Sequence, residues 1–370
     1  MSIETIEEKT LPVFFPPPTQ MFGHLMIPLS ILLAHKDTSD WLYSNYIQLC
    51  AIPNFWKYRD DEDIELINFY PIFFYEHKSV FLTVYNLHDG IINIEKKEFI
   101  NHMIKWIKNG YYIQIYLNLS EITGTYWYKK QEFNILGEAL FFGYDLKNKI
   151  FKFLSFDTIK EYRILEMTFD DLMKAFFSPV TRTLVKNCDW PVVGEEYGIL
   201  LYRFNDKAKY SIDINSIIRQ MEEYIYSKNS SHRFEIIDNE EIDHVYGLDI
   251  YKVLLSWLSL YNSEGIDIRP ICGLWDHKKI MKDRISYLVE KGYLDESKNQ
   301  LGKYSKVEEI ANKIRLLLFK YNLTRNNSIL KKMIFLLKEL PDMEFDILYD
   351  VISDLKKYDI SQSRVNNKKR

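Results

Sequence analysis

Cysteine, proline and glycine are all scarce in this chain of 370 residues, which contains 3 Cys, 11 Pro and 13 Gly. The three cysteines, Cys50, Cys188 and Cys272, are odd in number, widely separated and never in a Cys-x-x-Cys pair, which argues against a disulfide framework. No run of about 18 apolar residues is present, and the start at Met1–Glu8 is acidic where a signal peptide is basic. We therefore expect a reduced, cytoplasmic protein that does not insert into membranes.

The chain also lacks an excess of positive charge, because 48 Lys and Arg stand against 52 Asp and Glu, interspersed, for a net charge of −4. Nucleic-acid binding therefore has no electrostatic support. His77 and His88 have no partner at metal-ligand spacing, and the acidic stretch Arg59–Asp63 is more typical of a solvated loop than of a cation site. Gly-rich phosphate loops, HExxH and Gly-x-Ser-x-Gly are absent, so we expect no metal and no cofactor.

Apolar and aromatic residues are abundant, at 47% and 15%, which indicates a folded protein with a substantial core. Alternation with a period of two predicts strands at Tyr111–Leu119, Ala139–Tyr144 and Ile150–Phe156 in one sheet. Near Asn205 the period changes to about 3.6 residues. The sequence thus predicts an α/β domain over residues 1–205 and an all-helical domain over 206–370, with no strand beyond about residue 240.

Helical spacing in the amino-terminal part predicts a helix within Met21–Ala34, with its true start near Pro28, and a second helix over Asp37–Cys50. Ile64–Phe69 is also helix-like. In the carboxy-terminal part, we expect Pro341 to interrupt the last helical pattern and to separate Ser328–Leu340 from a final helix that ends near Lys357.

Four segments in order, Gly110-Tyr-Tyr-Ile, Tyr128-Lys-Lys, Phe141-Phe-Gly-Tyr-Asp145 and Phe151-Lys-Phe-Leu-Ser-Phe-Asp157, resemble the second half of a papain-like fold. The pattern is similar to the cysteine-peptidase-like family of natural-product biosynthesis proteins typified by butirosin biosynthesis protein H. Asp267-Ile-Arg269-Pro and Trp275-Asp-His277-Lys resemble the helical region of the same family. The resemblance implies a papain-like amino-terminal domain followed by a helical one.

The resemblance also implies where a catalytic site would lie. The family places its Cys at the start of the central helix, where this chain has Phe22–Met26 with His24 and no Cys. Its catalytic His would fall among Asn134, Gly137 and Glu138, and its orienting acid falls on Asp157. The thiol and the base that the family requires are therefore both missing. His24 taken alone is more often a hydrogen-bonded structural residue, and the apolar neighbours of Cys50 favour an inert thiol.

Two functions remain open from the sequence. The first is a non-catalytic papain-like protein of a bacterial specialised-metabolite pathway of the non-ribosomal peptide type, which binds a carrier protein, a pathway enzyme or a peptide intermediate. The alternative is an acyltransferase that moves an acyl or peptidyl group from a carrier-protein thioester to an amine. The missing thiol and base favour the first.

A partner-binding face is suggested by basic residues on the predicted helix at Asp276–Lys291. Lys278 and Lys282 lie one turn apart, with Lys279 and Arg284 close by. Because carrier proteins are acidic, we expect Lys278 and Lys282 to dock one; otherwise they form a solvated helix face. The sequence leaves the oligomeric state open.

Overall fold

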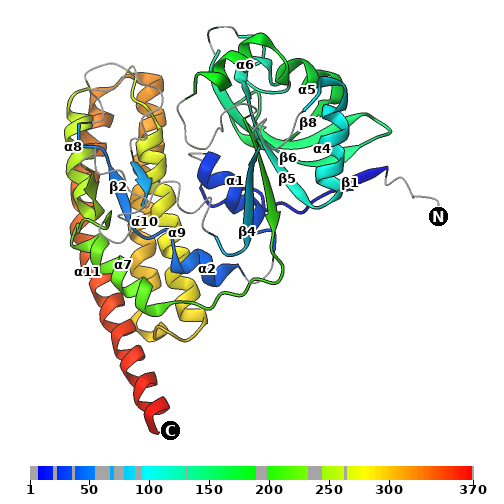
Figure 1. The fold of residues 1–370 in the computed structure, drawn as a ribbon. Coiled ribbons are helices and arrows are strands. Elements are labelled where there is room, and N and C mark those ends of the chain that lie inside the picture. Colours follow the sequence, from blue (N-terminus) through cyan, green and yellow to red (C-terminus); the bar gives the residue numbers. More distant parts are fainter. Residues whose placement is uncertain are drawn as a thin grey trace. The chain divides into compact units, whose positions relative to one another are not determined.

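The computed structural model describes residues 7–19, 23–35, 38–54, 67–70, 79–87, 94–130, 132, 134–188, 198–231, 244–261 and 265–368. The chain divides into two compact units. Unit 1 comprises Met1–Thr38 with Tyr75–Lys209, and unit 2 comprises Ser39–Phe74 with Tyr210–Arg370 (Figure 1). The second boundary lies close to the one expected at residue 205, but Ser39–Phe74 groups with the helical unit, which the sequence did not indicate.

Unit 1 is built on an antiparallel sheet, in which the described residues supply seven strands in the order β4-β9-β5-β6-β7-β8, with β1 paired to β6. The three predicted strands are confirmed as neighbours in the centre of this sheet. The strands are β1 (Glu8–Thr10), β4 (Leu82–Leu87), β5 (Tyr111–Asn118), β6 (Leu136–Asp145), β7 (Ile150–Phe156), β8 (Tyr162–Thr168) and β9 (Ile199–Phe204).

Helices α4 (Phe99–Lys108), α5 (Phe169–Phe176) and α6 (Pro179–Lys186) contact β5, and α4 is preceded by the short 3₁₀ turn η2 (Lys96–Glu98). The starts of α5 and α6 follow from their capping residues. Thr168 accepts a hydrogen bond from the backbone N–H of Asp171, and Ser178 accepts one from that of Thr181. A further 3₁₀ turn, η3 (Leu119–Glu121), follows β5.

Helix α1 (Gly23–Leu32) is buried along its whole length, as expected for a helix that is apolar all round. It starts at Gly23, five residues before Pro28, so the predicted start near Pro28 is wrong. A proline inside a helix removes one backbone hydrogen bond, and the surrounding packing of α1 offsets that loss. The consequence is that Gly23 and His24, and not the residues around Pro28, form the first turn.

Unit 2 is a helical bundle that also contains a small sheet of order β10-β2-β3. Figure 1 shows the long helices α9, α10 and α11 running along one another. The helices are α2 (Ser39–Ser44), α7 (Ile214–Ile225), α8 (Ile250–Ser259), α9 (Arg269–Glu290), α10 (Gln300–Thr324) and α11 (Asn327–Lys368), with 3₁₀ turns η6 (Gly247–Asp249) and η7 (Glu296–Lys298). The strands are β2 (Leu49–Ala51), β3 (Ile67–Phe69) and β10 (Val245–Tyr246).

Three predictions for unit 2 are wrong. The helix expected over Asp37–Cys50 shrinks to α2, because the backbone at Tyr46 turns left-handed (φ 56°) and the chain continues as β2. The last part of the helix-like Ile64–Phe69 is β3, and Val245–Tyr246 is a strand beyond residue 240. These strands pair with each other across large sequence separations, which a local pattern does not reveal.

Helix α11 continues through Pro341, where an interruption was expected. Leu337, Leu340 and Leu348 are buried on both sides of the proline, and α11 contacts α7, α8 and α10. Packing along the whole helix therefore outweighs the missing N–H of one residue. No helix in the part of the chain that the structure describes is long and apolar enough to cross a membrane.

Candidate functional site

The start of α1 lies directly against a carboxyl group of the sheet. A Cβ atom added to Gly23 would stand 1.6 Å from Oε2 and 2.1 Å from Oε1 of Glu138, on β6. Any side chain at position 23 would force this carboxyl group to move. Glu138 on the sheet therefore meets the first turn of α1.

The Glu138 carboxyl group has an unusual environment. Its Oε2 is buried and has no hydrogen-bond partner in the part of the chain that the structure describes, although the residue as a whole is only half-buried. Burial raises the pKa of this group to about 7, because the charged form loses water and gains no compensating partner. Glu138 thus changes protonation state near neutral pH, as groups that transfer protons or bind ligand donors do.

The neighbours of Glu138 are polar and largely buried. Tyr116 on β5 is its cross-strand partner. Burial, and after it the nearby charge of Glu138, raises the pKa of the Tyr162 hydroxyl group, which the Ser30 hydroxyl of α1 partly offsets. Neither the Tyr162 hydroxyl nor the Ser30 hydroxyl has a hydrogen bond of normal geometry to a described residue. Three polar side chains with buried oxygens, Glu138, Tyr162 and Ser30, therefore stand together, and among them the Glu138 Oε2 has no partner among the described residues.

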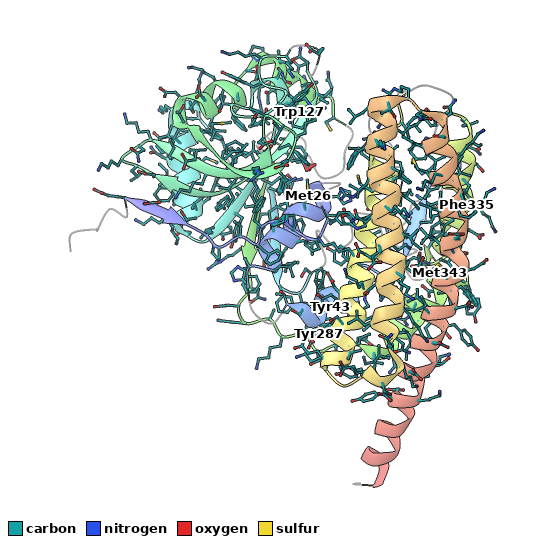
Figure 2. The ribbon with its side chains drawn as sticks, turned by 180° about the vertical axis from the view of Figure 1, so that it is seen from behind. Met26, Tyr43, Trp127, Tyr287, Phe335 and Met343 are labelled. Atoms are coloured by element: carbon teal, nitrogen blue, oxygen red, sulfur yellow. The ribbon has the colours of Figure 1, made fainter. Side chains whose placement is uncertain are left out.

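Aromatic rings extend from Tyr162 away from the carboxyl group. Its ring lies 5.3 Å from that of Phe156, which lies 6.0 Å from that of Trp127 in the loop between β5 and β6. Figure 2 shows Trp127 on this loop and Met26 on α1. Tyr126 follows at 6.0 Å from Trp127, with the ammonium groups of two lysines over its ring. The half-buried rings provide apolar surface beside the polar site.

Two other residues singled out by the sequence have structural roles elsewhere. Asn134 accepts hydrogen bonds from Asn118 Nδ2 at 2.9 Å and from Ser120 Oγ at 3.0 Å. Asp157 closes the turn between β7 and β8, where its Oδ1 accepts from the backbone N–H groups of Ile159 (2.9 Å) and Glu161 (3.0 Å). Among the described residues, no hydrogen bond or ion pair joins Asn134 or Asp157 to Glu138.

His24 and Glu138 are thus the two predicted positions that the structure places in one region, since His24 follows Gly23 directly in α1 and is buried at 7% exposure. Tyr162, Ser30 and Trp127 were missed by sequence reasoning. For Tyr162 a signal existed, because it begins the strand that follows Phe156 and the period of two puts it on the face of the sheet that carries Glu138. Ser30 and Trp127 have no comparable sequence signal.

The thiols belong to other elements. Cys50 is buried in β2 and Cys272 is in α9, both in unit 2, where burial and then the charge of Asp276 raise the pKa of Cys272 to about 12. Cys188, in unit 1, follows α6. No group of three or more His, Cys, Asp or Glu side chains within the described ranges is arranged to hold a metal ion. The acidic stretch at residues 59–63 and the histidines at 77 and 88 lie outside those ranges.

The expected docking face on α9 is not formed, because Lys278 is fully buried and pairs with Glu344 of α11 at 2.8 Å. Lys282 is partly exposed and pairs with Glu308 of α10 at 3.0 Å. Arg284 is buried as well. The prediction that Lys278 and Lys282 share a solvent-exposed face is therefore wrong, since an accessible partner-binding role requires an exposed ammonium group.

Lys278 belongs to a buried polar network that joins four further helices. Glu344 accepts hydrogen bonds from the hydroxyl groups of Tyr224 (α7, 3.0 Å), Tyr251 (α8, 2.9 Å) and Tyr304 (α10). Lys278 also donates to Tyr224 at 2.6 Å and contacts Nδ1 of His277 at 3.1 Å. Burial, reinforced by the charge of Glu344, raises the pKa of all three tyrosines well above the usual range. Every member has a partner, which indicates a structural role.

Next to this network, side chains of α9 form hydrogen bonds with the backbone at the end of α2 and just after it. The guanidinium of Arg284 donates to the backbone carbonyls of Tyr43 at 2.9 Å and Tyr46 at 3.0 Å, and also to that of Asn45. The Nε2 of His277 contacts the carbonyl of Ile47 at 2.8 Å. Figure 2 shows Tyr43 beside Tyr287 of α9, with ring centroids 4.7 Å apart. Two side chains of α9 thus satisfy backbone carbonyls at the end of α2 and just after it.

The site around Glu138 is therefore the candidate functional site of this chain. Comparison with known proteins adds no family to this picture, because no protein-family model matches the chain and no curated protein is significantly similar to it.

Proposed function

We propose that this protein is a non-catalytic binding protein with a papain-like amino-terminal unit, which acts in a specialised-metabolite pathway by holding a carrier protein, a pathway enzyme or a peptide intermediate. One observation carries the proposal. The space over the first turn of α1, where a thiolate would stand, is taken by the carboxyl group of Glu138 against Gly23. A carboxyl group in that place cannot form the thioester that acyl transfer by a cysteine enzyme requires.

The same carboxyl group supports a binding role. A ligand that donates a hydrogen bond to Oε2 of Glu138 would satisfy an atom that is buried without a partner among the described residues. The rings of Tyr162, Phe156 and Trp127 offer adjoining apolar contact. Polar anchors next to apolar walls are typical of ligand sites.

The alternative, an acyltransferase, is favoured by one feature. With a pKa of about 7, Glu138 is suited to act as a general base toward an attacking amine or water. This mechanism would proceed without a covalent enzyme intermediate. Among the residues that the family resemblance singled out, Glu138 alone would act as a catalytic residue.

Titration calorimetry and a thioester assay together distinguish the two functions. The probes are a carrier protein loaded with an aminoacyl group and the matching N-acetylcysteamine thioester. We expect binding of the loaded carrier without turnover of either probe, and binding about tenfold weaker for Glu138→Gln. Asp157→Asn is the matched control within the same sheet, and it should lower stability without changing affinity.

Three results would contradict the proposal. Turnover of the thioester that Glu138→Gln abolishes would establish the acyltransferase. Rapid alkylation of one cysteine by iodoacetamide at neutral pH, faster than in the unfolded chain, would reveal an activated thiol and remove the main support for a non-catalytic protein. Absence of binding to both probes would also reject the proposed function.

A further inference from the structure

Helix α11 carries an exposed stripe with a symmetric spacing. An α-helix turns by 100° per residue, and nine side chains of α11 from Ser328 to Lys356 lie within about 40° of Asp342 around the helix axis on this count. All are solvent-exposed except Ser353, which is half-buried. The stripe consists of Ser328, Lys331, Phe335, Lys338, Asp342, Asp346, Tyr349, Ser353 and Lys356.

Two large aromatic side chains on this stripe face solvent. Phe335 is 61% exposed and Tyr349 is 50% exposed, and each lies seven residues from Asp342, on opposite sides of it. Figure 2 shows Phe335 on the outer side of α11. The ring of Tyr349 stacks on that of Phe345 at 6.1 Å, and the Phe345 ring lies 5.7 Å from that of Tyr226, which follows α7 directly. Two exposed aromatic rings on one face of a helix are typical of an interaction surface.

The charges of the stripe are arranged in the same symmetric way. Lys338 lies four residues before Asp342 and Asp346 four residues after it, and neither forms an ion pair with a described residue. An antiparallel second copy of α11, related by a twofold axis through Asp342, would place Lys338 against Asp346 of the copy and Phe335 against Tyr349 of the copy. A twofold contact repeats each pairing, so two ion pairs and two aromatic pairs form at once.

We propose that this stripe is the interface of a homodimer in which the α11 helices of two copies pack antiparallel about Asp342. The stripe favours a second copy over an acidic or a basic partner, because it carries charges of both signs and because Lys338 and Asp346, at equal distances from the axis, complement each other. The contact runs along about 42 Å of helix and contains polar positions, and we expect a dissociation constant in the micromolar range. The two Asp342 side chains meet at the axis, where their like charges repel, and Lys338, one turn away on each helix, offsets this repulsion.

Sedimentation equilibrium of the full chain, over a hundredfold range of concentration that spans the micromolar range, tests the dimer. We expect a monomer–dimer equilibrium that added salt weakens. Phe335→Ser should weaken dimerisation tenfold or more, since it removes two aromatic contacts. Leu323→Ser on α10 is the matched control, because Leu323 is 86% exposed but lies off the stripe, and it should leave the dimer unchanged.

A charge exchange tests the register. Lys338→Glu alone and Asp346→Lys alone each create two like-charge contacts and should weaken the dimer about tenfold. The double variant Lys338→Glu with Asp346→Lys restores opposite charges and should recover wild-type affinity. A chain that stays monomeric at all concentrations, a dimer insensitive to Phe335→Ser, or a double variant no stronger than the single ones would overturn the proposal. Circular dichroism and thermal unfolding of each variant verify that it is folded.

Discussion

At the scale of the residue, Glu138 is kept in an environment that does not favour its charged form. Oε2 is buried, the helix start at Gly23 lies against the carboxyl group, and the described surroundings offer it no hydrogen bond. An ionisable group in such a position lowers the stability of the folded protein at pH values where it is charged. Residues that lower the stability of the folded protein in this way commonly belong to functional sites.

The stability of the protein should therefore depend on pH through Glu138. The pKa of this group rises from 4.5 to about 7 on folding, so between these values the folded state binds more protons than the unfolded state. Stability consequently falls as the pH rises from about 4.5 to about 7, by at most about 3 kcal/mol because the residue keeps some contact with solvent. Glu138→Gln should remove this dependence and should melt at a higher temperature than the wild type at pH 8, with little difference at pH 5.

Thermal unfolding across this pH range provides the measurement, with Glu166→Gln on the exposed side of β8 as the control that should keep the wild-type pH dependence. An unchanged slope in Glu138→Gln would mean that another group titrates.

The resemblance to a known family selected position 138 from the sequence. It also pointed to the stretch Phe22–Met26, which contains Gly23, but not to the contact between Gly23 and Glu138, because a contact across 115 positions leaves no local pattern in the sequence.

At the scale of the element, helices α7 to α11 are held in register by the carboxylate of Glu344 and the ammonium group of Lys278. Sequence spacing placed Lys278 and Lys282 on one face, which is geometrically right. It could not show that α9 is buried on more than one side, because buried lysines are rare and a polar residue normally marks a surface. The interruption predicted at Pro341 is wrong for a related reason, because the tertiary packing of α11 outweighs the effect of a local helix breaker.

Neutralising the two lysines should separate their roles. Lys278→Met leaves Glu344 buried without its counter-ion and should destabilise the protein by about 3–5 kcal/mol. Lys282→Met removes a partly exposed ion pair and should cost less than about 1 kcal/mol. Urea unfolding measures both, and combining Lys278→Met with Glu344→Gln should recover part of the loss. Similar small effects of Lys278→Met and Lys282→Met would show that the network contributes little.

At the scale of the whole molecule, each unit is assembled from two separate parts of the chain. The change of period near Asn205 lies a few residues from the division between the units at Lys209. It could not reveal that Ser39–Phe74 belongs to the second unit, because the link is made by β2, which pairs with β10, and by carbonyls bound to Arg284. Such long-range pairing is not contained in any local window of sequence.

A fragment of residues 206–370 should accordingly fail to unfold cooperatively. Without residues 39–74 it lacks α2, β2 and β3, and Arg284 and His277 would be buried without their carbonyl partners. Joining residues 39–74 to 210–370 through a Gly-Ser linker is the matched control, which should restore a single transition in chemical denaturation followed by circular dichroism. Cooperative unfolding of 206–370 alone, as stable as the linked chain, would contradict this prediction.

The hydrogen bond between Arg284 and the carbonyl of Tyr46 spans 238 residues, and this separation sets an order of events during synthesis. At roughly 10 residues per second, Tyr46 leaves the ribosome on the order of 20 s before Arg284. During that interval the carbonyls of Tyr43 and Tyr46 have no guanidinium to bind, and the strand β2 has no β10 beside it. The segment pairs with β3 soon after synthesis but keeps its other edge unpaired until β10 is translated.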